Sequence, residues 1–578
     1  MKRIFICLAM LLCALCACTR EDPVPAEPVM QDGVWTGTGE GRSGTILVRI
    51  TVQDNKITDI VVVSQSESSF AQNAINEMVA RALQKQALLN PEVDAISGAT
   101  LTSNGVIDAV NMAINAAMGQ SDSGKALYKD GSCDIVVIGA GGAGLTAAVE
   151  AASGGKLKII VLEKQGILGG NTNYSTGGIN AAGTEAQEAL GIKDSPDLFY
   201  EDTMRGGKQK NIPSLVRSLV DHAAATISWL TSLGADLSDV GLMGGSSVKR
   251  THRPKGGTAI GPHLMKVLKE ASSKSNIEIR TSNKVVGLLS SSGTVTGVKV
   301  QNADGSTYSL HAKAVVIATG GFGANLQMVT SYQPSLAGFA TLNHPGATGD
   351  AFSWLASVGG STIQMEYIQI HPTAEAENHI LITEAVRGNG AILVNHAGKR
   401  FVNEMDTRDA VSAAILVQDK GEAFLLFDNA VRSSLASIET YANQHLMAEG
   451  ADIASLAQKA SLPSEALSST LERYNSFQKA GVDEDFGRSG TEMTAALETP
   501  PFYAIRVKPA IHHTMGGIKV DADMHVLRAD DIPVPGLFAA GEVTGGIHGA
   551  NRLGGNGVAD IVVNGKIAGH GAAEYASK

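Results

Sequence analysis

The sequence predicts an α/β protein in which a mainly parallel sheet is interrupted by an inserted α+β domain and preceded by a small α+β unit. Apolar runs ending in glycines occur at 134–144, 312–323 and 535–546. Continuous apolarity is typical of parallel strands, because helices cover both faces of their sheet. Glycine is abundant, with 65 of 578 residues against a usual share of about 7%. A chain of this length also exceeds a single core.

The first 31 residues are not expected to belong to the fold. Residues 1–17 begin with basic side chains and continue as an apolar run that is too short to span a bilayer. Ala17 precedes Cys18 in "LCAC", which resembles a bacterial lipoprotein signal. We therefore expect an extracytoplasmic protein anchored to a membrane by a lipid on Cys18, with ordinary secretion as the alternative. Residues 18–31 are polar and proline-rich, as in a tether.

The cysteines exclude several redox centres. Five are present, and Cys133 alone remains once the signal and the anchor are set aside. A single cysteine forms no internal disulfide, no C-x-x-C-H haem site and no iron–sulfur ligand set, so redox chemistry in this chain points to flavin. The net charge of −11 argues against nucleic acid as a partner.

Residues 32–118 are expected to form the small α+β unit, followed by a linker at 119–131. Two segments rich in β-branched residues flank a "QDN" turn, and helical stretches come after them. The last helix follows the sequence "DAISGATLTS", with Thr102 or Ser103 as its N-cap. The other expected elements are strands at 44–52 and 56–64 and a helix at 70–89.

A glycine-rich turn opens the nucleotide-binding domain. Gly139, Gly141 and Gly144 form G-x-G-x-x-G between the strand "DIVVI" and a helix. The first glycine permits a tight turn, the second lets the backbone approach a pyrophosphate, and the helix N-terminus adds a positive dipole. Glu163 ends the next strand, where a carboxylate accepts hydrogen bonds from ribose. This Rossmann-like context predicts a dinucleotide site.

A second loop favours FAD over NAD. "LGGNTNYSTGGINAAG" (168–183) follows the ribose-binding strand, and later strands end in "ATGG" and "AAGE". The set resembles the FAD-binding domain of the fumarate reductase/succinate dehydrogenase flavoproteins. The loop lacks the histidine that carries covalent FAD in the succinate dehydrogenase branch, so the resemblance implies non-covalent FAD. The further cofactor-binding residues that it implies are Gly170, Asn171, Thr172, Gly177, Gly178, Gly320, His513, Glu542 and Asn556.

Five further motifs resemble the soluble, extracytoplasmic flavocytochrome c fumarate reductases, over roughly 130–575. This resemblance implies an enzyme that passes hydride from FAD to fumarate, giving succinate, and a capping domain at 365–510 inserted into an FAD-binding domain formed by 132–364 and 511–578. The motifs are "IQIHPT" (368–373), "TEAVRGNGAILVN" (383–395), "KRFVNEMDTRDAVSAAI" (399–415), "IHHTMGGIKV" (511–520) and "GEVTGGIHGANRLGGNG" (541–557).

Fumarate is a small dianion, so its site needs strong donors at both ends. By resemblance, Arg552 and His512 hold one carboxylate, and His371 and Thr383 hold the other. An arginine suits this task because its charge persists at every physiological pH.

The same resemblance makes Arg408 the proton donor. An arginine serves as an acid only if it is reprotonated at once, and Glu384 and Arg387 match the family's proton path. Taken alone, without the surrounding motifs, Arg408 would be interpreted first as a surface salt-bridge partner of Asp406 or Asp409. The resemblance also implies an alkali-metal site, whose residues would be Thr514, Met515, Gly516, Glu542 and Thr544.

The chain departs from these flavocytochromes at its N-terminus, where it has no multihaem domain. "DAISGAT" instead resembles the acceptor of FMN-binding domains, in which a flavin transferase joins FMN to the last threonine through a phosphoester. That residue is Thr100 here. FMN would then receive electrons from a quinol- or cytochrome-linked membrane donor and pass them to FAD.

Two alternatives remain for the function. The same machinery could act on another 2-enoate, such as urocanate, methacrylate or a cinnamate. His371 and Glu384 favour the small dicarboxylate, because urocanate reductases typically have Tyr and Asp there. The second alternative is a non-catalytic flavin electron carrier.

Overall fold

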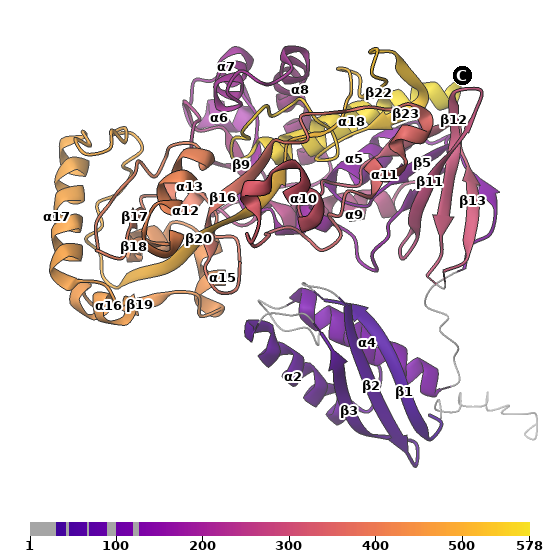
Figure 1. Ribbon diagram of the computed structural model, residues 1–578, viewed down its shortest axis with the longest axis horizontal. Helices are drawn as coiled ribbons and strands as arrows, with labels where there is room; N and C mark the ends of the chain where they lie inside the picture. Colours follow the sequence, from indigo (N-terminus) through magenta and orange to yellow (C-terminus); the bar gives the residue numbers. More distant parts are fainter. Residues whose placement is uncertain (1–29, 42–44, 66–68, 90–99, 119–126, 304) are drawn as a thin grey trace, which may run out of the picture.

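The computed structural model describes residues 30–41, 45–65, 69–89, 100–118, 127–303 and 305–578. Its mixed α/β architecture confirms the predicted fold class (Figure 1). The expected signal, most of the tether and linker, and the acceptor motif up to Ala99 lie outside the described residues. Among the described helices, none is both long and apolar enough to cross a membrane.

The N-terminal unit is a three-stranded antiparallel sheet in the order β1-β2-β3, packed against two helices (Figure 1). The sequence did not predict the first strand, "GVWTGTGE", because its glycines weaken the strand pattern. Those glycines have a packing role: a Cβ on Gly37 would lie 2.1 Å from the Ala109 carbonyl oxygen, so helix α4 lies directly on strand β1. The elements are β1 (Gly33–Glu40), β2 (Thr45–Gln53), β3 (Lys56–Ser64), α2 (Ser69–Lys85) and α4 (Thr100–Ala117).

Helix α4 begins earlier than predicted. Thr102 and Ser103 are both buried and lie inside the first helical turn, so the prediction that either of them is the N-cap was wrong. Ser and Thr favour N-cap positions through local hydrogen bonds, but here both residues lie within the helical turn that begins at Thr100. Thr100 is the first residue of the helix.

Segments far apart in the sequence assemble the central sheet, as predicted. Its order is β10-β6-β5-β14-β23-β22, with parallel pairing throughout except at β22. The sequence did not predict the edge strands β10 and β22. The strands are β5 (Ile135–Ile138), β6 (Ile159–Leu162), β10 (Ile277–Arg280), β14 (Ala314–Ile317), β22 (His525–Leu527) and β23 (Pro533–Ala539).

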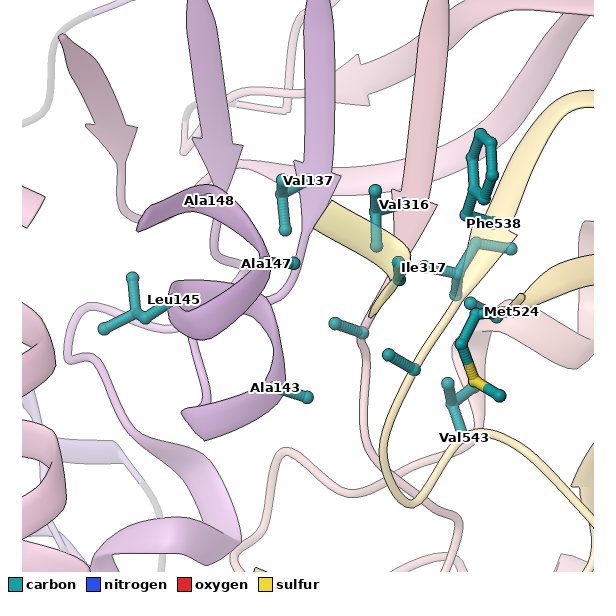
Figure 2. Close-up of a cluster of buried hydrophobic side chains, with 14 of the residues drawn as sticks. Val137, Ala143, Leu145, Ala147, Ala148, Val316, Ile317, Met524, Phe538 and Val543 are labelled. Atoms are coloured by element: carbon teal, nitrogen blue, oxygen red, sulfur yellow. The ribbon is translucent and has the colours of Figure 1, made fainter. Parts of the chain in front are cut away.

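Helices α5 (Gly142–Ala151) and α18 (Asn556–Ser577) pack on this sheet and on each other. Figure 2 shows Leu145, Val316 and Phe538 among the buried side chains of this core. A Cβ on Gly569 would lie 2.3 Å from the Ala147 carbonyl oxygen, so the two helices touch through their backbones. This contact brings both helix N-termini to the same end of the sheet.

The inserted region has its own sheet, in the order β16-β20-β18-β17, and its own apolar core. Strand β20 runs across 510–511, where the sequence placed the return to the FAD-binding domain, so a single strand passes from one unit to the other. The elements that matter for the site are β16 (Ile368–Glu375), β17 (Ile392–Val394), β18 (Ala423–Asp428), β20 (Phe502–Thr514), α12 (Ala385–Gly388), α13 (Arg408–Leu416) and α15 (Ser437–Asn443).

Candidate active site

One cavity extends from the glycine-rich turn to a group of cationic side chains in the inserted region. It brings together most of the residues predicted separately for FAD and for substrate. The predicted residues that line it are Gly139, Gly141, Glu163, Gly170, Asn171, Thr172, Gly177, Gly178, Gly320, His371, Thr383, Glu384, Arg408, His512, His513, Glu542 and Arg552.

The glycines at the nucleotide end leave the backbone open to the cavity. Gly170 and Gly320 adopt positive φ values of 49° and 74°, and a Cβ on either would meet nothing within 4 Å. Gly139 is required for packing instead, since its Cβ would lie 2.4 Å from the Ala318 carbonyl oxygen. With the N-terminus of α5 beside them, these open glycines fit the pyrophosphate of FAD.

Glu163 is held at the ribose position by two backbone amides. Ala140 N–H donates to Oε2 at 2.9 Å and Gln165 N–H donates to Oε1 at 2.8 Å. Burial raises the pKa of Glu163, and these hydrogen bonds oppose the rise. Each carboxylate oxygen keeps a lone pair for a ribose hydroxyl, so the residues present fit FAD.

Several predicted residues lie behind the cavity wall instead of lining it. The Asn556 side chain accepts a hydrogen bond from Asn180 and donates one to Thr203, so it joins protein segments. The side chain of Thr100 is outside the described residues. The predicted residues absent from the lining are Gly144, Arg387, Thr514, Met515, Gly516, Thr544 and Asn556.

Two residues of the predicted alkali-metal site, Thr514 and Glu542, contact each other. The backbone N–H of Thr514 donates to Glu542 Oε1 at 3.1 Å, and His513 Nδ1 lies 3.6 Å from the same oxygen. The Thr544 hydroxyl donates to the Gly541 carbonyl instead. Burial raises the pKa of Glu542. The metal site stays a prediction.

His371 is oriented as a neutral hydrogen-bond donor. Its Nδ1 accepts from the Thr373 backbone N–H at 3.2 Å, which leaves the proton on Nε2. Burial, followed by the charge of Arg408, holds the pKa of His371 well below 6.5. Thr383 is fixed in turn by its own N–H, which donates to Tyr441 Oη at 2.9 Å. Both residues therefore offer donors to an anion.

His512 and Arg552 complete the donor set. The His371 and His512 rings lie 5.1 Å apart between centroids, and burial holds the pKa of His512 well below 6.5. Burial and the nearby charge of Arg408 lower the pKa of Arg552 to about 9. Among the described residues, Arg552 Nε has no hydrogen-bond partner. A substrate carboxylate would supply the missing acceptor.

Arg408 points into the cavity from the start of α13 and is 8% exposed. Its Nε donates to Glu384 Oε2 at 2.7 Å and its Nη1 donates to Gln369 Oε1 at 3.1 Å. Asp409 pairs with Lys208 instead. The alternative of a surface salt bridge is therefore wrong.

Glu384 and Arg387 continue the chain of charges. Arg387 Nη2 lies 3.8 Å from Glu384 Oε2, and its Nη1 donates to the Glu404 carbonyl at 2.5 Å. Burial raises the pKa of Glu384, but Arg408 and Arg387 outweigh it, so the pKa lies below its ordinary value. Burial lowers the pKa of Arg387. The result is a buried cation–carboxylate–cation sequence, which suits proton relay.

Sequence reasoning missed three supporting residues. Gln369 lies two positions before His371 on β16, and this period-2 spacing could have signalled a shared face. Gly244 and Tyr441 contact the predicted residues from 140 and 58 positions away. Contacts between residues so far apart in the chain cannot be predicted from the spacing of residues within a motif.

Two family models and several known proteins match this chain. Residues 134–558 match the FAD binding domain family, and residues 41–115 match the FMN-binding domain family. A "Fumarate reductase (cytochrome)" from Shewanella frigidimarina is 46% identical over 446 residues, covering 77% of this chain and 78% of that protein.

A second relative and a solved structure are also similar to this chain. A "Urocanate reductase" from Eggerthella lenta is 34% identical over 565 residues, which cover 94% of this chain and 92% of that protein. The solved structure of the open conformation of a flavocytochrome c3 fumarate reductase superimposes with a TM-score of 0.65 at 39% identity. That alignment covers 78% of this chain and 79% of the other.

Proposed function

Because the chain belongs to the FAD-dependent fumarate reductase flavoprotein family, we propose that it reduces the carbon–carbon double bond of fumarate to give succinate. It is a flavin-dependent oxidoreductase with an FAD-binding and an FMN-binding domain. The observation that carries the substrate proposal is the convergence of Arg552, His512, His371 and Thr383 beside Arg408 in the cavity that begins at the nucleotide loop.

The charges at this end of the cavity suit a dianion. His371 and His512 are neutral because burial lowers the pKa of each well below 6.5. Glu384 pairs with Arg408 and lies near Arg387, so these three groups carry one net positive charge. Arg552 adds a further cation, and the carboxyl group of Glu542 lines the same cavity. Several cationic donors around one small volume favour the two carboxylates of fumarate over the single carboxylate of urocanate.

Bound FAD would supply the hydride, and the chain's own residues orient the substrate and supply the proton. With Nε bound to Glu384 and Nη1 bound to Gln369, Nη2 is the nitrogen of Arg408 that is left for the substrate. A proton lost there would leave a neutral guanidine. Glu384 is ionised, so it would first take up a proton from the Arg387 side of the path and then pass it to that guanidine. Arg387 Nη2 lies next along the path, 3.8 Å from Glu384.

The N-terminal unit provides electron entry in this proposal. FMN joined to Thr100 by a flavin transferase would receive electrons from a quinol- or cytochrome-linked membrane donor. The match to the FMN-binding domain and the "DAISGAT" motif support this assignment. The sequence around Cys18 supports an extracytoplasmic protein held to the membrane by lipid.

The second candidate is the same chemistry on another 2-enoate. It is favoured by the resemblance to a urocanate reductase over 94% of the chain. A substrate panel with reduced viologen decides between them. We expect fumarate to be the best substrate, and an inert fumarate with an active urocanate or aryl acrylate would overturn the proposal.

A further inference from the structure

The catalytic carboxylate of Glu384 is held from the FAD-binding half of the molecule. The backbone N–H of Gly244 donates to Glu384 Oε1 at 2.6 Å, while Oε2 accepts from Arg408. Gly244 belongs to a loop, 242–247, that connects strands β8 (Asp239–Gly241) and β9 (Thr251–Arg253). The two oxygens of this one side chain are therefore bound by different parts of the fold.

The 242–247 loop fits closely against the inserted region. Met243 is 1% exposed and packs in the apolar core of that region, and it also lines the cavity. A Cβ on Gly244 would lie 3.0 Å from Glu384 Oε1 and 3.0 Å from the carbonyl oxygens of Met405 and Asp406. Glycine is therefore the residue that lets the amide approach the carboxylate without displacing it.

A buried ion triad fixes the far end of the loop. Asp202 accepts hydrogen bonds from Ser247 N–H at 2.8 Å and from the Ser247 hydroxyl at 2.5 Å. Arg250 lies between Asp194 and Asp202 at 3.0 Å from each, and all three side chains are fully buried. Such a triad resists rearrangement because separating it would leave a buried charge unpaired.

We propose that Gly244 is a positioning residue of the proton relay: its N–H, held in place by the anchor at Ser247, orients the Glu384 carboxylate toward Arg408. The terminal torsion of a glutamate is soft, so a carboxylate bound through one oxygen still rotates. A charge-assisted bond to the second oxygen fixes its plane. Gly244 is not among the residues that line the cavity, so in this proposal it acts only through Glu384. This inference rests on the proposed function, since the relay matters only if Arg408 supplies the proton.

The test is Gly244→Ala in the flavin-loaded protein, with fumarate and reduced viologen. We expect kcat to fall about 10- to 100-fold, part of the range for removing a proton-transfer group, while KM stays within about threefold. The low-pH limb of kcat should move to higher pH, because the N–H no longer stabilises ionised Glu384. Ser247→Ala, which loosens the anchor and leaves the amide in place, should give a smaller change in the same direction.

Ser246→Ala is the matched control. It lies in the same loop and is 7% exposed, and its hydroxyl has no partner among the described residues. Its kcat and pH profile should equal those of the wild type. FAD content and melting temperature check that each variant is folded. If the wild type leaves fumarate unreduced, the proposed function fails. If the wild type is active and both Gly244→Ala and Ser247→Ala keep its kcat and pH profile, the positioning role is refuted.

Discussion

Replacing Glu384 by Gln tests the proton relay most directly. The substitution keeps the volume and one acceptor oxygen but removes the negative charge between Arg408 and Arg387, which lie 2.7 Å and 3.8 Å from it. The local net charge rises by one unit inside a buried site. We expect kcat to fall by about 10²–10⁴-fold, the usual scale for lost general acid–base catalysis. Removing one partner of a buried ion pair also costs about 3–5 kcal/mol of stability.

The assay separates the relay from flavin chemistry. Reduction of bound FAD by viologen should keep its wild-type rate, because Glu384 accepts its hydrogen bonds from Arg408 and Gly244 and none from the glycine turn that fits FAD. Reoxidation of the flavin by fumarate should slow to the new kcat. A variant that turns over fumarate within about threefold of the wild-type rate, with normal flavin content, would refute the relay.

Three further predictions follow from the same geometry. Arg408→Ala should lower kcat by about 10²–10⁴-fold. The control Asp409→Ala, which removes only the ion pair with Lys208, should keep kcat near the wild-type value. Full activity in Arg408→Ala would favour a non-catalytic electron carrier. Thr100→Ala should abolish the flavin that stays with the denatured chain and leave releasable FAD, as measured by fluorescence. The pKa of Arg552 is lowered to about 9, so kcat/KM for fumarate should fall as pH rises through that value. A flat profile to pH about 10.5 would exclude Arg552 as the titrating group.

The sequence predicted the strands and helices that are indicated by a short, continuous run of residues. The strands before Gly139 and Gly320 are short and wholly apolar, and both were found in the central sheet. Strand β1 was missed because its glycines serve a helix that lies 70 residues further along the chain. The start of α4 was misplaced because Thr102, a residue type that favours N-caps, lies buried inside the helix, and local sequence does not reveal this.

The residues of the candidate site also fall into two groups: those that a local motif predicts and those that only the fold reveals. His371, Thr383 and Arg408 stand in recognisable motifs, so resemblance located them before any contact was known. Gln369 and Gly244 matter because of hydrogen bonds to Arg408 and Glu384, and these bonds depend on how distant segments pack. Motifs therefore indicate the residues proposed to bind the substrate, whereas the groups that orient these residues become visible only in the structure.

The candidate site is built from both the FAD-binding half and the inserted region. In the proposed site, the FAD-binding half contributes Arg552 and the Gly244 amide that binds Glu384, while the inserted region contributes Arg408, His371 and Glu384 itself. Neither half contains all of these residues. Separating them would leave Glu384 Oε1 without the Gly244 amide and would remove Arg552 from the other proposed substrate ligands. Substrate binding and proton supply thus depend on the same interface, so weakening it should reduce both together.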